Sequence, residues 1–138
     1  MLEGGAADQS FVPSATLGFM KLVVSDLAAA QAFYAGAFGL ETVEIIETDA
    51  MAEAILRRRG TDKGFSLILY RHKAARRIEV GTAHGPLGLL VRDVDQAYAH
   101  ALAQGARASR PPFDVGKRRA AFLLDPDGHE LELISLRA

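Results

Sequence analysis

The sequence predicts an α+β protein built from two βαβββ modules in tandem, with mixed sheets curled into a cup and the helices outside. Three observations support this prediction. The chain has 138 residues, a length that suits one compact domain. Its composition, 49% hydrophobic and 24% charged, is typical of a globular protein. The same order of strand, helix-start and helix-stop signals occurs twice, offset by nearly half the chain, which indicates an internal duplication.

The first module is expected at about residues 16–72, after a loose Gly- and Ala-rich tail at residues 1–15. Asp26 is a helix-start signal, and Gly39 ends the apolar helical period that follows it. Residues 51–59 fit either a short helix or a strand, because Ala, Leu and Arg favour helix. The predicted strands, all rich in residues that suit a pleated surface, are residues 16–24, 41–48 and 64–70.

A basic linker, about residues 73–83, leads to the second module at about residues 84–138. The second helix is expected to begin at Asp93 and to end at Gly105, and a loop is expected at the Pro-Pro pair, residues 111–112. The predicted strands of this module are residues 86–91, 118–125 and 129–136. Both modules together form one domain, residues 16–138.

Composition and charge exclude several classes of protein. There are 16 basic and 17 acidic side chains, so a concentrated basic face for nucleic acid is not expected. No apolar run reaches the ~20 residues that span a bilayer, and no membrane partner is expected. Cysteine is absent, which excludes a thiol nucleophile, a thiolate metal site and a disulfide. Because the first 15 residues also lack a signal-peptide pattern, the expected location is the cytoplasm.

Strand alternation predicts which side chains enter the cup. In the first strand Phe19, Lys21 and Val23 should face the cup, while the alternate residues contact the helix. In the last strand Glu130 and Glu132 should face the cup. A lysine within an apolar strand needs a partner, so we expect Lys21 to meet Glu132 or a ligand anion.

The duplicated modules, the opening MKLVVSDLAAAQAFYAGAFGL and the ending DPDGHELELI resemble the vicinal oxygen chelate superfamily. That group includes glyoxalase I, extradiol dioxygenases, and fosfomycin- and bleomycin-resistance proteins. The resemblance covers residues 16–136. It implies a divalent ion held by inward-facing strand residues, with open coordination sites for a substrate that has two adjacent oxygens. It also implies a homodimer, since members of the group often pair so that two subunits complete the sites.

Transferred to this sequence, the four metal positions of the family fall on Phe19, Ile68, Pro86 and Glu132. Of these only Glu132 is a metal donor, and His84, two residues before Pro86, is a further candidate. The expected cofactor is therefore either none or a Zn, Ni, Mn or Fe ion held by Glu132 and His84. Because catalytic zinc usually has three protein ligands, glyoxalase I and extradiol dioxygenase activities are not expected.

Three functions remain open, and an enzyme ranks first. In that hypothesis Glu132 is the general base and Lys21 stabilises the oxyanion, in lyase- or isomerase-type proton transfer on an oxygenated small substrate. The alternative is a metal-free protein that binds and sequesters a small molecule, as drug-resistance proteins do. The third is a structural or interaction role. The expected substrate contacts are Phe19, Ile68, Tyr70, Phe113 and Arg119.

Overall fold

The computed structural model describes residues 10–136. The first module consists of β1 (Phe19–Val23), α1 (Leu27–Phe38), β2 (Leu40–Glu47), β3 (Met51–Arg58) and β4 (Ser66–His72). The second consists of β5 (Leu87–Val91), α2 (Val94–Ala103), β6 (Arg107–Val115), β7 (Arg118–Leu124) and β8 (Glu130–Ser135). The predicted α+β class and the tandem βαβββ order are confirmed.

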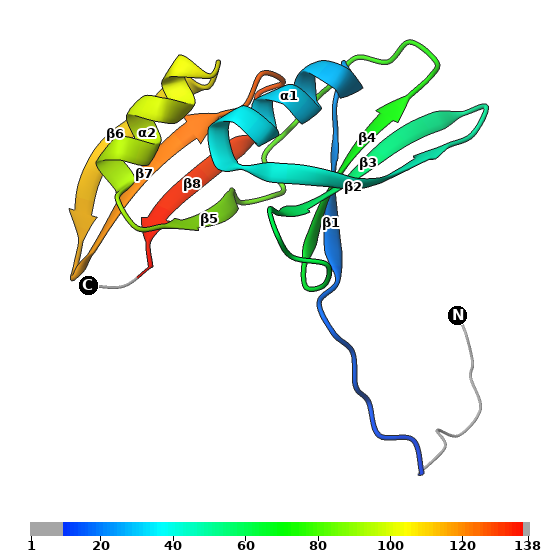
Figure 1. Ribbon diagram of the computed structural model, residues 1–138, viewed down its shortest axis with the longest axis horizontal. Helices are drawn as coiled ribbons and strands as arrows, with labels where there is room; N and C mark the ends of the chain where they lie inside the picture. The colour runs from blue at the N-terminus through cyan, green and yellow to red at the C-terminus, as the bar shows by residue number, and fades with distance from the viewer. Residues whose placement is uncertain (1–9, 137–138) are drawn as a thin grey trace.

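Each module forms one four-stranded mixed sheet, and the two sheets have equivalent strand orders, β1-β4-β3-β2 and β5-β8-β7-β6. The first pair in each order is parallel and the others are antiparallel. A parallel pair needs a crossover connection, and here the crossover carries the helix onto one face of its sheet. In Figure 1 the two sheets are splayed apart and both helices lie along one side, with the opposite faces free of helices.

The helix ends follow the sequence signals closely. Asp26 and Asp93 are the N-caps, and each carboxylate accepts a hydrogen bond from a backbone N–H in the first turn. Gly39 ends α1 with φ of 70°, a left-handed conformation that glycine adopts without steric cost. Helix α2 ends slightly earlier than predicted, with Gln104 rather than Gly105 at its C-cap.

Sheet pairing decides two local predictions. Residues 51–58 form a strand, because β3 is hydrogen-bonded to β2 on one side and to β4 on the other, and this pairing overrides the helix-favouring composition. The predicted loop at the Pro-Pro pair was wrong, since Pro111 and Pro112 lie within β6. Strand β6 is the edge of its sheet, where prolines are tolerated, and its register shifts between Arg110 and Phe113.

The core is one hydrophobic cluster between the helices and the two sheets, and it contains residues of both modules. The predicted alternation holds in the first and last strands. The cluster contains the helix-facing residues Leu22, Leu131 and Leu133 of these strands, and Val24, which directly follows β1. The alternate residues lie outside it, on the helix-free faces.

The predicted tail is described only from residue 10 onward, and residues 1–9 lie outside the described residues. Residues 11–18 have no helix or strand and extend away from the first sheet in Figure 1. Three apolar side chains of this segment are largely exposed to solvent, Phe11, Val12 and Leu17. The segment therefore adds little to the core of its own chain.

A buried polar network joins α1 to the turn before β8. The Tyr34 hydroxyl donates a 2.7 Å hydrogen bond to Asp125 Oδ2, and neither residue is more than 1% exposed. The ring nitrogen Nδ1 of His129 lies 2.9 Å from the same oxygen. Beside this network, the Ser25 backbone and hydroxyl groups both donate to the Asp127 carboxylate. The Asp-Pro-Asp-Gly turn of the second module is thus held against the first module.

Ionisation strengthens this network. Burial would raise the pKa of Asp125, but the hydrogen bonds from His129 and Tyr34 outweigh it and hold that pKa below its ordinary value. Burial would lower the pKa of His129, but the hydrogen bond to Asp125 and the Asp125 charge outweigh it and raise that pKa. Burial and the neighbouring Asp125 raise the pKa of Tyr34. These shifts favour the imidazolium–carboxylate form of the pair beside a neutral phenol.

Replacing Tyr34 with Phe should lower the free energy of unfolding by about 1.5–3 kcal/mol, because a buried ionised acceptor loses its donor. The ring itself, which packs against Phe33 and Phe38, is retained. Urea denaturation measures the loss. The matched control is Tyr98→Phe on α2, because the Tyr98 hydroxyl has no hydrogen-bond partner in residues 10–136. Equal effects of the two substitutions would contradict the role given to the Tyr34 hydroxyl.

The His129–Asp125 pair should make stability depend on pH. Because folding raises the pKa of His129, its contribution is complete below the ordinary value of 6.5 and is lost as pH rises through the higher folded pKa. Folding lowers the pKa of Asp125, so its contribution is lost only as pH falls through that lower folded pKa. Urea unfolding at a series of pH values tests this against His129→Gln. The stability difference between the two proteins should shrink as pH rises from 6.5 through the higher folded pKa of His129, and a constant difference would contradict it.

Candidate functional site

The helix-free face of the first sheet carries several of the residues predicted to face the cup. Strand register places Lys21 opposite Ile68 and Glu53 opposite Tyr70, and alternation puts Phe19, Lys21, Ile68 and Tyr70 on one side. Glu53 joins them from β3. We call this surface the sheet-1 face, defined by Phe19, Lys21, Glu53, Ile68 and Tyr70. The three predicted substrate contacts of the first module, Phe19, Ile68 and Tyr70, therefore lie on this face.

An ion pair lies at the centre of the sheet-1 face. Lys21 Nζ is 2.9 Å from Glu53 Oε1, and the lysine side chain is 42% exposed while that of Glu53 is 7% exposed. The same ammonium lies 5.3 Å from the centroid of the Tyr70 ring and 5.9 Å from that of Phe19. Aromatic rings attract a cation, and the buried Glu53 carboxylate holds the ammonium in place by ion pairing. The result is a positioned positive charge that solvent and ligands can reach.

Sequence reasoning offered Glu132 or a ligand anion as the partner of Lys21, whereas the structure pairs it with Glu53. Glu132 lies on the other sheet, on β8, opposite Gly88 and Phe122. Glu53 is not among the predicted site residues, because the sequence of residues 51–59 fits either a helix or a strand. Once β3 is recognised as a strand, alternation alone puts this carboxylate on the helix-free side of the sheet.

The second sheet presents an aromatic surface beside a carboxylate. The Phe113 and Phe122 rings are stacked with centroids 6.1 Å apart, and Arg110 Cζ lies 3.5 Å from the centroid of Phe113. Glu132 stands next to Phe122 across the β7–β8 pair. We call this surface the sheet-2 face, defined by Arg110, Phe113, Phe122 and Glu132. The predicted contact Phe113 and the predicted base Glu132 are thus neighbours on one sheet, and Arg110 is a cation that sequence reasoning missed.

Arg119, a predicted substrate contact, lies apart from both faces. Its guanidinium donates to both Asp95 oxygens, at 2.8 and 3.1 Å, and to Asp114 at 2.9 Å. The hydrogen bond from Arg119 holds the pKa of Asp95 below its ordinary value. Because Asp95 belongs to α2, Arg119 ties that helix to β7 on the helix side of the sheet. The structure does not bring it to Lys21 or Glu132.

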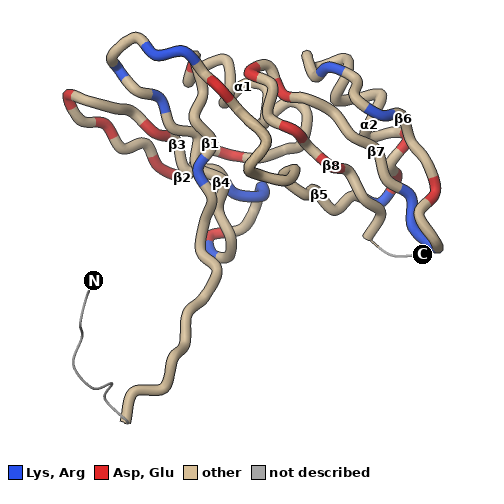
Figure 2. Tube along the Cα trace, turned by 180° about the vertical axis from the view of Figure 1, so that it is seen from behind, with Lys and Arg blue, Asp and Glu red and all other residues tan. Residues whose placement is uncertain are grey.

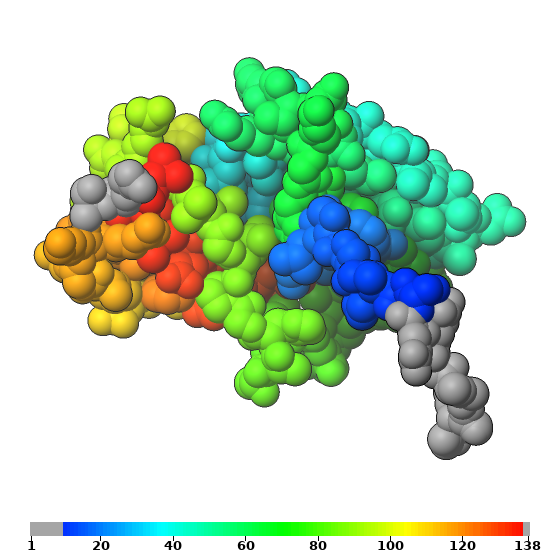
Figure 3. Space-filling view, turned by 90° about the horizontal axis from the view of Figure 1, so that it is seen from below, coloured from blue at the N-terminus to red at the C-terminus, as the bar shows by residue number. Residues whose placement is uncertain are grey.

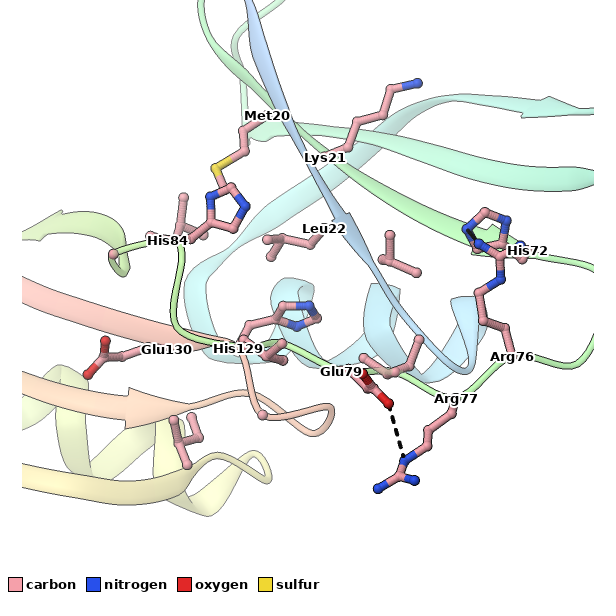
Figure 4. A pocket seen from close by; sticks show the side chains of 18 residues that line it. Met20, Lys21, Leu22, His72, Arg76, Arg77, Glu79, His84, His129 and Glu130 are labelled. Atoms are coloured by element: carbon pink, nitrogen blue, oxygen red, sulfur yellow. Dashed lines mark hydrogen bonds and ion pairs between the residues drawn. The ribbon is translucent and has the colours of Figure 1, made fainter.

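A groove of about 580 Å³ lies at the junction of the modules, between β1, the linker and the turn before β8. Figure 3 shows the yellow-green linker between the orange-red second module and the blue N-terminal segment. The groove contains three imidazoles, His72, His84 and His129, beside apolar residues such as Met20. Lys21 also borders this groove, and Figure 4 shows its side chain extending away from His84 and His129. His84 therefore belongs to this junction, while Glu132 does not line it.

The side chains present do not fit the divalent ion that the family resemblance implies. Phe19 and Ile68 carry no donor atoms, and the two candidate donors are separated, Glu132 on the sheet-2 face and His84 in the junction groove. Within residues 10–136 no group of three His, Cys, Asp or Glu side chains is arranged to hold a metal ion. A catalytic zinc site usually needs three such ligands.

Surface charge is mixed in sign. Figure 2 shows acidic residues along β2 and basic residues in the linker that follows β4. In the described part of the chain, no helix is long and apolar enough to cross a membrane.

Comparison with known proteins identifies a matching family and several similar proteins. A family model, the Glyoxalase/Bleomycin resistance protein/Dioxygenase superfamily, matches residues 16–133. A probable chloroplastic lactoylglutathione lyase of Arabidopsis thaliana is 29% identical over 115 residues, which cover 80% of this chain and 33% of that protein. The chain therefore spans about a third of the length of this curated relative.

Solved structures share the fold at low sequence identity. Glyoxalase I from Zea mays superposes with a TM-score of 0.80 at 23% identity, covering 88% of this chain and 45% of that one. A glyoxalase/bleomycin resistance protein/dioxygenase family enzyme from Burkholderia phytofirmans PsJN gives 0.68 at 23% identity, covering 88% and 99%. Because the family model extends across both modules, the chain belongs to the glyoxalase/bleomycin resistance protein/dioxygenase superfamily.

Proposed function

We propose that this protein is an enzyme that carries out lyase- or isomerase-type proton transfer on an oxygenated small molecule at the helix-free faces of its sheets. The observation that carries the proposal is the Lys21 ammonium, held 2.9 Å from buried Glu53 on the sheet-1 face. When a proton leaves carbon beside a carbonyl, negative charge develops on the oxygen. A positioned ammonium is suited to stabilise that charge.

The apolar and aromatic surroundings of Lys21 support this role. Phe19 and Tyr70 flank the ammonium, and Ile68 lies opposite Lys21 in the strand register. Apolar neighbours reduce solvation of the charge and so strengthen its attraction for an oxyanion. The positions that bind metal in the family resemblance hold Phe19 and Ile68 here, so the cation of this site belongs to the protein itself.

We propose that the working form is a homodimer in which the sheet-1 face of one copy meets the sheet-2 face of the other. This arrangement brings Glu132, the proposed general base, toward Lys21 of a second copy. Large exposed apolar side chains on both faces support it, Phe19 at 59% and Leu90 at 63% exposure. The chain also covers only 45% of the maize glyoxalase I chain, which leaves room there for a second equivalent unit.

The second candidate function is metal-free binding and sequestration of a small molecule. The stacked Phe113 and Phe122 rings with Arg110 above them favour it, because such a surface suits a planar ligand without any chemistry. The proposed partners in either case are a small molecule and a second copy. We propose a cytoplasmic location, which suits a chain without cysteine.

Lys21→Met should abolish the proposed reaction while retaining most of the side-chain volume. The assay is NMR detection of deuterium incorporation next to the carbonyl, in D₂O, over a panel of hydroxycarbonyl compounds and 2-oxo acids. Loss of one oxyanion-stabilising group should slow exchange by about 100-fold or more. Lys63→Met, in the exposed loop between β3 and β4, is the matched control and should retain the wild-type rate. No exchange with the wild-type protein, or equal rates in both variants, would contradict the proposal.

The dimer is tested by sedimentation. The wild-type protein should sediment with twice the 14.8 kDa mass of the chain. Leu90→Glu puts a charge on the proposed interface and should weaken dimerisation by tenfold or more, since a buried unpaired charge is costly. Ala99→Glu, on the exposed side of α2, should leave it unchanged. A wild-type protein that is monomeric at the concentration of the assay would contradict the dimer.

A further inference from the structure

The carboxylate of Glu53 is unusual among the buried polar groups of this chain. The residue is 5% exposed in the middle of β3, and its Oε1 accepts no hydrogen bond from residues 10–136. Its only ionic contact in that part of the chain is Lys21 Nζ, at 2.9 Å. Buried carboxylates are normally stabilised by several donors. The charge of Glu53 therefore depends on the ammonium of a single, half-exposed lysine.

The two charges differ in their access to solvent. The side chain of Lys21 is 42% exposed and that of Glu53 is 7% exposed, so a molecule arriving from solvent meets the ammonium first. The neighbours of the pair are Tyr70, the His72 ring against Tyr70, and Ile46, which lies opposite Glu53 on β2. In the described residues no second cation contacts Glu53. Any ligand that attracts the ammonium competes directly with Glu53 for it.

This competition has an electrostatic consequence. An anion bound at Lys21 neutralises the ammonium in part. The buried carboxylate of Glu53 then lacks a full counter-charge. Such a group is strongly destabilised, and taking up a proton removes the penalty. Binding of an oxyanion at Lys21 and protonation of Glu53 should therefore occur together.

We propose that Lys21 and Glu53 form a proton-linked binding site for weak oxygen acids, such as enols, phenols and hydroxamic acids. When a ligand binds, Lys21 Nζ passes one proton to the Glu53 carboxylate, and the resulting amine takes the proton of the ligand O–H group. The ligand is then an oxyanion beside the restored ammonium, and Glu53 is a neutral carboxylic acid. One O–H bond breaks in the ligand, one forms on Glu53, and no proton is exchanged with solvent.

This inference rests on the proposed function and gives it a substrate class. An enol is the form of a carbonyl compound that carries the acidic oxygen, and the site accepts it without a metal ion. Glu53 does not touch the ligand, because Lys21 covers it, and it acts as a positioning residue that stores the proton. Lys21 is the residue that contacts the ligand oxygen.

Isothermal titration calorimetry counts the protons exchanged on binding, when it is repeated in buffers that differ in ionisation enthalpy. The two probes are benzohydroxamic acid, a weak acid that is neutral at pH 7, and benzoate, which is fully ionised there. The wild-type protein should bind benzohydroxamic acid with no net proton exchange. It should bind benzoate with uptake of about one proton from the buffer.

Glu53→Gln removes the proton store and retains the shape of the side chain. This variant should release about one proton when it binds benzohydroxamic acid, with affinity lowered by about tenfold or more, and should take up none with benzoate. Glu53→Asp retains a carboxylate and should restore the wild-type proton counts. Glu44→Gln, which removes an exposed carboxylate from β2, is the matched control and should behave as wild type.

Identical proton counts in the wild-type protein and Glu53→Gln would overturn the inference, and so would a wild-type protein that binds neither probe. Failure of this inference is distinguishable from failure of the proposed function. Suppose that deuterium exchange is lost in Lys21→Met and unchanged in Glu53→Gln. This result would support the proposed enzyme function and contradict the proton-linked site.

Discussion

The position of the functional surface follows from one constraint, that a crossover helix covers only one face of its sheet. Both helices lie on the same side of the molecule, and the apolar strand residues on that side form a single core. The alternate strand residues are therefore free to carry charge, as Lys21 and Glu132 do. The duplication applies the same constraint twice and creates two faces of different chemistry, one around an ammonium and one around stacked rings.

A second constraint fixes the two modules to each other. Asp125 belongs to the turn before β8 and accepts a hydrogen bond from Tyr34 on α1, so the anchor links this turn to the helix of the first module. Its charge is stabilised from both modules, because Tyr34 and His129 both contact it. Asp125 and His129 belong to the sequence motif Asp-Pro-Asp-Gly-His. Their contacts with each other and with Tyr34 give this motif a structural role. The residues proposed to carry out chemistry lie on the helix-free faces instead.

Much of the fold was predictable because the strongest signals are local. Asp26, Asp93 and Gly39 act at helix ends, where one side chain or one backbone angle decides the outcome. The misread segments depend on distant partners. Pro111 is tolerated in β6 because this strand lies at the edge of its sheet. Glu53 lies on the sheet-1 face because residues 51–58 form a strand that is paired on both sides. The partner of Lys21 could not be predicted for the same reason, since it required the register between three strands.

The pairing of Lys21 with Glu53 bears on the metal ion that the family resemblance implies. The resemblance puts metal positions at Phe19 and Ile68, which carry no donor atoms, and Lys21 stands on the same face two residues after Phe19. A divalent ion stabilises an oxyanion by its charge, and an ammonium supplies the same kind of stabilisation with a single charge. The ammonium differs from a divalent ion in one respect, since one buried carboxylate can neutralise its single charge completely. The site can then accept an acid as a neutral molecule and hold it as an anion, and the protein supplies both the cation and the store for the proton.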